Sequence, residues 1–247
     1  MQEERSLLDT IMSVLTPVHR DGYKFIAAFA FGAFVLSRFS EPLGWAGMIA
    51  TVWCAYFFRD PERFPPENAN LVVSPADGRV SAIETVPVPQ ELDLDGETRT
   101  RISVFLSVFD VHINRSPVSG RIAKMVYVPG KFLNAELDKA SEENERQCLT
   151  LETGLGKRVG CVQIAGLVAR RIVTFVSEGT TLGLGERFGL IRFGSRTDIY
   201  LPPGCEPLVR VGQRAIGGET VLADLSDGKG RQSCPGQVRS GHVSETR

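Results

Sequence analysis

Three residues of this chain have the types needed for nucleophilic catalysis: Ser195, His112 and Asp77. Ser195 directly follows Gly194 in GLIRFGSRTDIYLP (residues 189–202), in the middle of sequence that otherwise resembles a pair of strands. A serine hydroxyl becomes a nucleophile when an imidazole removes its proton and a carboxylate orients that imidazole. The chain therefore holds the parts of a serine-centred site, if folding brings them together.

Each of the three also has a purely structural interpretation. A serine after a flexible glycine is typical of a turn or bulge, and Asp77 lies in VSPADGRV (residues 73–80), where Ala-Asp-Gly favours a turn. His112 is the one histidine away from the terminal segments, and a lone histidine often has only a structural role. The Gly-x-Ser-x-Gly elbow of the common α/β hydrolases is missing around Ser195. A serine hydrolase using Ser195, His112 and Asp77 stays one alternative.

The elements that must position these residues are mostly strands. From Leu71 onward, β-branched runs alternate with glycine and proline, which predicts a mainly antiparallel sandwich or barrel. The segment at 135–146 is the one helix-like stretch in this part, and it has few apolar positions. Residues 226–247 are polar and glycine-containing, and we expect a disordered tail there.

Two uncharged apolar segments precede the β-rich part, at residues 25–37 and 43–58. Both fall short of the roughly 20 residues that cross a bilayer straight. We expect an arm at 1–24, a membrane-associating helical hairpin at 25–58 and a β-rich catalytic domain at 59–225. The fold class is thus α+β, a predominantly antiparallel sandwich or barrel with an N-terminal apolar hairpin. Two buried core helices are the alternative for the hairpin.

Composition narrows the function classes. The 28 basic and 29 acidic side chains nearly cancel, so no nucleic-acid partner is expected. Five cysteines without a close pair suggest neither a disulfide framework nor a zinc site, and a reducing compartment fits best.

Five motifs in a fixed order resemble the proenzymes of the phosphatidylserine decarboxylases, in the compact form of that family. They are FFRDPERFPP (57–66), VSPADGRV (73–80), FLSVFDVHINRSP (105–117), DKASEENER (138–146) and RFGSRTDIYLP (192–202). The resemblance implies a lyase of phospholipid biosynthesis, made as a zymogen that cuts its own chain between Gly194 and Ser195.

The resemblance also implies the chemistry of that cut. Ser195 Oγ attacks the carbonyl of Gly194, the resulting ester is eliminated, and hydrolysis leaves a covalent pyruvate (pyruvoyl) group at residue 195. The fragments 1–194 and 195–247 stay together as a heterodimer. The new carbonyl forms a Schiff base with phosphatidylserine, CO₂ leaves without any metal, and His112 returns a proton to give phosphatidylethanolamine.

One departure from the family concerns Arg115. Larger members carry a second histidine three places after the position of His112, where this chain has Arg115, and a guanidinium cannot act as a base at neutral pH. Either His112 serves both self-cleavage and turnover, or another group deprotonates Ser195; Asp77 is carried over as the third catalytic residue. Arg115 and the adjacent Asn114 are expected to contact the substrate, Arg115 through its phosphate or carboxylate.

The lipid substrate gives the apolar hairpin a purpose. Moving acyl chains into water costs about 0.8 kcal/mol per CH₂, so the enzyme must come to the bilayer. We expect a peripheral or monotopic protein on the cytoplasmic face of the cell membrane, because basic residues flank the hairpin on both sides. Two further alternatives are a pyruvoyl enzyme for a soluble amino acid and a membrane-tethered lipoyl-like carrier barrel modified at Lys124.

Overall fold

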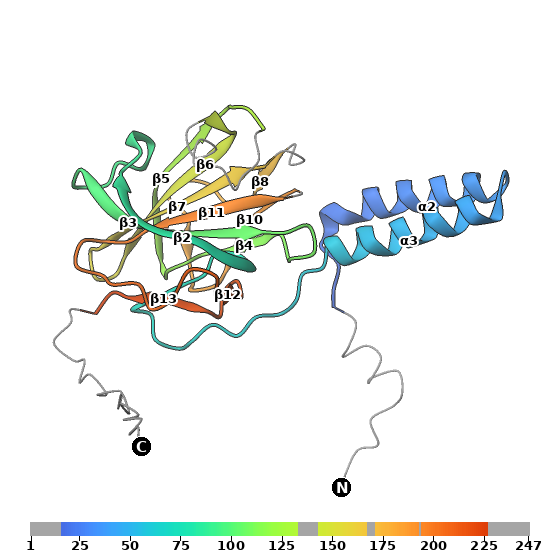
Figure 1. Cartoon of the computed structure of the whole chain (residues 1–247). Coiled ribbons are helices and arrows are strands. Elements are labelled where there is room, and N and C mark those ends of the chain that lie inside the picture. The colour runs from blue at the N-terminus through green and yellow to red at the C-terminus, as the bar shows by residue number, and fades with distance from the viewer. Residues whose placement is uncertain (1–15, 133–142, 167–170, 193, 227–247) are drawn as a thin grey trace, which may run out of the picture.

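A computed structural model describes residues 16–132, 143–166, 171–192 and 194–226. It shows an α+β protein in which a helical hairpin extends from a β domain (Figure 1). The helical elements are η1 (Arg20–Gly22), α2 (Tyr23–Ser37), α3 (Glu41–Phe57) and η2 (Gln90–Leu92). The strands are β1 (Leu71–Val73), β2 (Gly78–Pro87), β3 (Thr98–Leu106), β4 (Ile113–Arg115), β5 (Gly120–Val128), β6 (Arg146–Thr153), β7 (Arg158–Ala165), β8 (Ile172–Thr174), β9 (Thr181–Leu182), β10 (Arg187–Ile191), β11 (Ser195–Tyr200), β12 (Arg214–Ala215) and β13 (Val221–Asp224).

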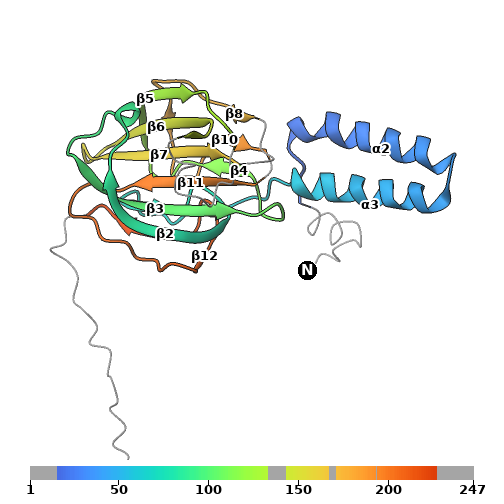
Figure 2. The ribbon, with the colours of Figure 1, turned by 45° about the horizontal axis from the view of Figure 1, so that its top comes forward.

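The main sheet is antiparallel and follows the order β12-β2-β3-β11-β7-β6-β5-β9. Figure 2 shows its central strands stacked in this order and curling into a half-barrel. Two smaller antiparallel sheets, β4-β10-β8 and β1-β13, complete the domain. The expected fold class is therefore confirmed, with a curled sheet as its centre.

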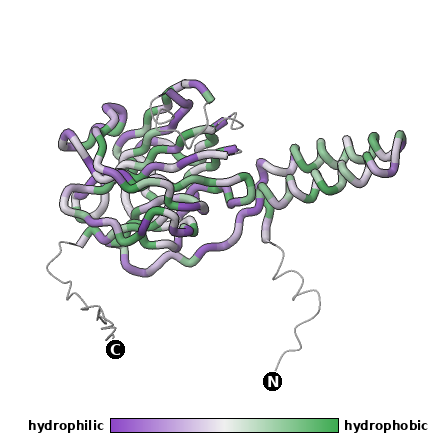
Figure 3. Tube along the Cα trace, in the orientation of Figure 1, coloured by the Kyte–Doolittle hydropathy of each residue, from purple (hydrophilic) through white to green (hydrophobic). Residues whose placement is uncertain are grey.

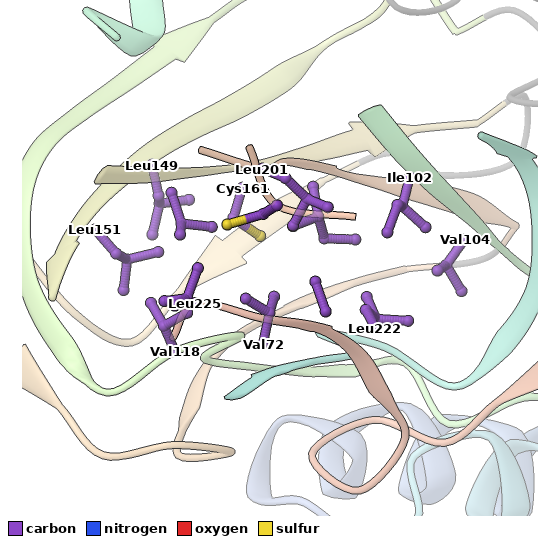
Figure 4. Close-up of a cluster of buried hydrophobic side chains, with 14 of the residues drawn as sticks. Val72, Ile102, Val104, Val118, Leu149, Leu151, Cys161, Leu201, Leu222 and Leu225 are labelled. Carbon is purple, nitrogen blue, oxygen red and sulfur yellow. The ribbon is translucent and has the colours of Figure 1, made fainter. Parts of the chain in front are cut away.

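Alternating side chains of the main sheet build the core inside the half-barrel. Ile102 and Val104 on β3 and Cys161 on β7 are fully buried in the cluster that Figure 4 shows. Val72 and Leu222 reach the same cluster from β1 and β13. Because the side chains of a strand alternate between its faces, this pattern fixes which residues of β11 point inward. Ile199 belongs to the cluster, so Thr197 and Ser195 share its face.

The two helices of the hairpin pack against each other in antiparallel directions, and hydrophobic residues make up much of both (Figure 3). The exposed large side chains include Phe29, Phe31, Phe34, Val35, Leu36, Leu43, Trp45, Met48, Ile49 and Val52. The alternative of two buried core helices is therefore wrong. None of the described helices is long and apolar enough to cross a membrane.

The remaining expectations concern the tail, the N-terminal arm, the helix-like segment and Lys124. The tail lies outside the described residues except for Ser226. The first 15 residues of the arm and residues 135–142 of the helix-like segment also lie outside them. Lys124 lies inside β5 and its ammonium is 3.9 Å from a carboxylate oxygen of Asp93. A carrier lysine would need a hairpin tip, so this position does not support the carrier alternative.

Candidate active site

The Gly194–Ser195 peptide lies where an irregular segment enters the most deeply buried strand of the sheet. Ser195 is the first residue of β11, and it pairs with Leu106 on β3 and Ala165 on β7. Its side chain is fully buried. Gly194 is half-buried and has a φ of +56°, a left-handed conformation that costs any residue with a Cβ about 1–2 kcal/mol. The sheet thus holds Ser195 firmly, while glycine allows the bend just before it.

His112 lies in the connection from β3 to β4, close to the same bend. Its carbonyl oxygen accepts a hydrogen bond from the Ile191 amide, at 3.2 Å. Leu106, the neighbour of Ser195, is the residue at which β3 ends and this connection begins. The β3–β4 connection is therefore held at two points, by Leu106 pairing with Ser195 and by His112 bonding to Ile191. The fold thus brings His112 and Ser195 to the same end of the half-barrel.

The tautomer of His112 follows from its hydrogen bond. Nδ1 lies 2.9 Å from the backbone carbonyl of Asp110, and a carbonyl oxygen can only accept, so Nδ1 carries the proton. Nε2 is then left with a free lone pair, and it is buried without a hydrogen-bond partner in the described part of the chain. A neutral imidazole with a free Nε2 is the form that a general base needs.

Burial favours this neutral form. It lowers the pKa of His112 from 6.5 to about 4, and the positive charge of Arg59 adds to the shift, against the opposing effect of the Asp110 carbonyl and carboxylate. Part of the burial comes from Phe57 at the end of α3, whose ring centroid is 4.2 Å from that of His112. At neutral pH His112 can accept a proton.

Asp77 holds a turn and contacts a residue that the sequence reasoning missed. Its Oδ2 accepts a hydrogen bond from Arg63 Nη2 at 2.7 Å, and its Oδ1 accepts one from the Gly217 amide at 2.8 Å. The next residue must be glycine, because a Cβ on Gly78 would lie 2.1 Å from the Phe105 carbonyl oxygen. Burial raises the pKa of Asp77, against the charge of Arg63. Among the described residues, no hydrogen bond joins Asp77 to His112; the partners of its carboxylate are Arg63 and the Gly217 amide.

Arg115 is buried and its guanidinium binds the protein itself. Nη1 donates to the Gly185 carbonyl at 3.0 Å, and Nη2 donates to the Pro61 carbonyl at 2.8 Å and lies 3.4 Å from Asp60 Oδ1. These contacts hold the irregular 58–66 segment against β4. Arg115 is therefore not part of the substrate site proposed below.

A row of polar side chains lies on the inner face beside Ser195. Thr197 pairs with Gln163 in the neighbouring strand, and Gln163 Nε2 donates to Asn114 Oδ1 at 2.7 Å. In the described residues, Ser195 Oγ, Thr197 Oγ1, Asn114 Nδ2 and Gln163 Oε1 are buried without a hydrogen-bond partner. Unpartnered buried polar atoms are costly and rare, and their clustering indicates a functional site.

Asn114 was expected at the site from its motif, whereas Thr197 and Gln163 were not. The available signal was clearest for Gln163, a polar residue at an inward-facing place of the largely apolar β7, whereas Thr197 lies in the mostly polar sequence of β11. The described residues contain no group of three or more His, Cys, Asp or Glu side chains that could hold a metal ion.

The comparison with known families covers this whole arrangement. The family model described as phosphatidylserine decarboxylase matches residues 50–223 of the chain. The matched part begins within α3 and ends within β13. It therefore includes Asp77, His112, Gly194 and Ser195.

Proposed function

Because the chain belongs to the phosphatidylserine decarboxylase family, we propose that it makes a pyruvoyl group from Ser195 and with it converts phosphatidylserine to phosphatidylethanolamine and CO₂. The observation that carries the proposal is the Gly194–Ser195 peptide itself. A left-handed glycine precedes a serine whose hydroxyl is buried and has no hydrogen-bond partner among the described residues. Neither feature stabilises the fold, so both are best explained by chemistry at this bond.

The residues around position 195 suit a pyruvoyl group. A ketone and its adjacent amide present acceptor oxygens. Among the described residues, the Thr197 hydroxyl on β11 and Asn114 Nδ2 on β4 are donors without a hydrogen-bond partner. The group is also covalently part of β11, so no separate binding pocket is needed. A pyruvoyl group supplies an electrophilic carbonyl that takes up the substrate amine and accepts the electron pair left behind by CO₂.

Self-cleavage uses the chain's own atoms. In the proposal, His112 Nε2 takes the Ser195 hydroxyl proton, and Oγ attacks the Gly194 carbonyl carbon as the peptide C–N bond breaks and the nitrogen is protonated. Removal of the Ser195 α-proton then expels the Gly194 carboxylate and leaves a dehydroalanine. Addition of water and loss of ammonia complete the conversion. Because its pKa is lowered to about 4, the His112 ring is neutral at pH 7 and has a lone pair on Nε2 that can take the Ser195 hydroxyl proton.

The same histidine can serve turnover. A neutral His112 accepts a proton while the substrate amine reacts, and the resulting imidazolium is a strong acid at this buried position. It can then return the proton to the substrate Cα after CO₂ has left. This cycle lets one imidazole do the work for which Arg115 is unsuited.

The sheet explains how two cleaved fragments would remain one enzyme. β11 belongs to the fragment 195–247, and it pairs along six residues with β3 on one side and with β7 on the other. β12 and β13 of the same fragment pair with β2 and β1. All four partner strands belong to fragment 1–194, so the heterodimer needs no covalent link.

The hairpin supports an assignment to the membrane surface. Its exposed side chains form an apolar surface that a bilayer would cover, and exposed apolar patches commonly mark interaction sites. We propose that it attaches the enzyme to the cytoplasmic face of the cell membrane, as a peripheral or monotopic protein, where phosphatidylserine is available.

The function is tested with phosphatidylserine carrying a labelled carboxyl carbon, presented in vesicles. The wild-type chain should release labelled CO₂ and form phosphatidylethanolamine, and Ser195→Ala should do neither. Free serine should be a poor substrate. Release of CO₂ by Ser195→Ala, or turnover of free serine as fast as the lipid, would contradict the proposal.

A further inference from the structure

A basic cavity lies where the hairpin meets the β domain. It has a volume of about 350 Å³ and is lined by Asp21 and Lys24 near the start of α2, by Arg171 and the residues of β8, and by Arg192. Three cationic side chains and one carboxylate thus line the cavity. The excess of positive charge indicates an anionic ligand.

The guanidinium of Arg192 packs against the protein, but one of its hydrogen-bond donors has no partner among the described residues. Its central carbon lies 5.0 Å from the centre of the Phe25 ring of α2, and the Arg192 amide donates a hydrogen bond of 3.4 Å to the Arg171 carbonyl. Its Nε is buried without a hydrogen-bond partner in the described part of the chain. A fixed arginine with an unused donor is well suited to bind a phosphate oxygen.

The cavity lies close to the reactive bond along the chain. Arg192 is three residues before Ser195, so an extended backbone would separate the two Cα atoms by at most about 10 Å. In phosphatidylserine only a few covalent bonds separate the phosphorus from the amino nitrogen. A headgroup whose amine reaches residue 195 would therefore place its phosphodiester within reach of the Arg192 side chain.

We propose that Lys24, Arg171 and Arg192 bind the phosphodiester of the lipid substrate. The inference rests on the proposed function, and it replaces Arg115, whose guanidinium is already bound to the protein. The cavity lies between the hairpin and the catalytic domain. This position suits the phosphodiester, which lies between the acyl chains and the reacting amine of the lipid.

The proposal is tested with dihexanoyl-phosphatidylserine below its micelle concentration, so that membrane attachment plays no part. Arg192→Gln should raise KM about tenfold, the effect of losing one charge-assisted hydrogen bond, while kcat changes less than twofold. Arg171→Gln and Lys24→Gln should raise KM in the same direction. Arg210→Gln, an exposed arginine in the turn before β12, is the matched control and should leave KM unchanged.

Binding is also measured without turnover, by calorimetric titration with monomeric dihexanoyl-phosphatidylglycerol, a phosphodiester that has no amine. The wild-type chain should bind it about tenfold more tightly than Arg192→Gln does. Because Arg192 is close to the cleavage site, the cleaved fraction of each variant is read on a denaturing gel. If Arg192→Gln fails to mature, then Arg171→Gln and Lys24→Gln decide the question.

Three results would overturn the phosphodiester assignment: KM and lipid affinity unchanged in all three variants, effects seen on anionic vesicles but not on the monomeric lipids, or inorganic phosphate binding as tightly as the lipid. The second result would mark a bilayer-binding surface and the third a free-phosphate site. Failure of the proposed function looks different, because the wild-type chain would then form no phosphatidylethanolamine even though the calorimetric comparison could still be made.

Discussion

The Phe57 ring, at the end of α3, lies against the His112 imidazole, with the ring centroids 4.2 Å apart and the planes tilted by 38°. Both side chains are almost fully buried, at 1% and 2% exposure. The hairpin that we assign to the membrane therefore ends on the histidine that we assign to catalysis. The contact also keeps water from the imidazole, which is the main cause of its low pKa.

The buried histidine predicts a loss of stability in acid. The pKa of His112 is about 4 in the folded protein against 6.5 normally, so the unfolded chain binds more protons between these values. The free energy of unfolding should then fall by about 3 kcal/mol as the pH is lowered from 6.5 to 4. Denaturant titrations of wild type and His112→Gln should differ in this window, with a flatter pH dependence for the variant. Parallel curves would show that His112 is not buried in its neutral form.

The Thr197 hydroxyl, which has no hydrogen-bond partner in the part of the chain that the structure describes, predicts opposite effects on stability and activity. Thr197→Val keeps the shape of the side chain and removes a buried polar group, so the free energy of unfolding should stay the same or rise by about 1 kcal/mol. The rate of cleavage or of turnover should fall at least about tenfold. Thr153→Val is the control, because that hydroxyl donates to the Lys157 carbonyl: it should lower stability and leave both rates unchanged. A fully active Thr197→Val chain would remove Thr197 from the site.

The left-handed conformation of Gly194 predicts slow maturation of Gly194→Ala. A Cβ there would meet no atom within 4 Å, so the penalty comes from the backbone alone. A cost of about 1–2 kcal/mol corresponds to cleavage about 5- to 30-fold slower if the bend persists in the transition state. Gly154→Ala, in the open turn after β6, should mature at the wild-type rate. The measurement is the time course of fragment formation after synthesis, and equal rates for both variants would contradict the role given to Gly194.

The exposed hairpin predicts that charges on it release the protein from vesicles. Phe31 and Trp45 are each 69% exposed, and burying such side chains in lipid contributes about 2–3 kcal/mol each. Phe31→Glu combined with Trp45→Glu should therefore lower partition into phosphatidylserine-containing vesicles at least about 100-fold, as measured by sedimentation. Leu155→Glu, in the turn between β6 and β7, is the control. Undiminished sedimentation of the double variant would contradict the membrane role of the hairpin.

Much of the fold could be predicted from local sequence patterns. Runs of β-branched residues separated by glycine and proline identify strands, and they gave the antiparallel β domain. The uncharged segments gave the two helices. The Gly194–Ser195 pair and His112 came from motifs, because single residues without periodic context give no other signal.

The contacts of the irregular segments could not be predicted in this way. Three contacts join irregular stretches or element ends to distant parts of the chain: the Asp77–Arg63 pair, the Arg115–Pro61 hydrogen bond and the tilted ring contact of Phe57 with His112. Such contacts depend on how loops pack against the sheet. The two-residue period of strands and the 3.6-residue period of helices carry no information about them. The inward polar positions of Thr197 and Gln163 were visible in the sequence, but their meaning required the register of β11 and β7.

The most direct test of the central claim is the mass of the purified wild-type chain under denaturing conditions, with and without a carbonyl-reactive probe. The account predicts two fragments, 1–194 and 195–247, of which the smaller is lighter by one ammonia than a chain beginning with serine and reacts with phenylhydrazine. Ser195→Ala should give one uncut chain without a reactive carbonyl. An active wild-type protein that is intact, with a free Ser195 hydroxyl and no ketone, would contradict the account and favour a hydrolase.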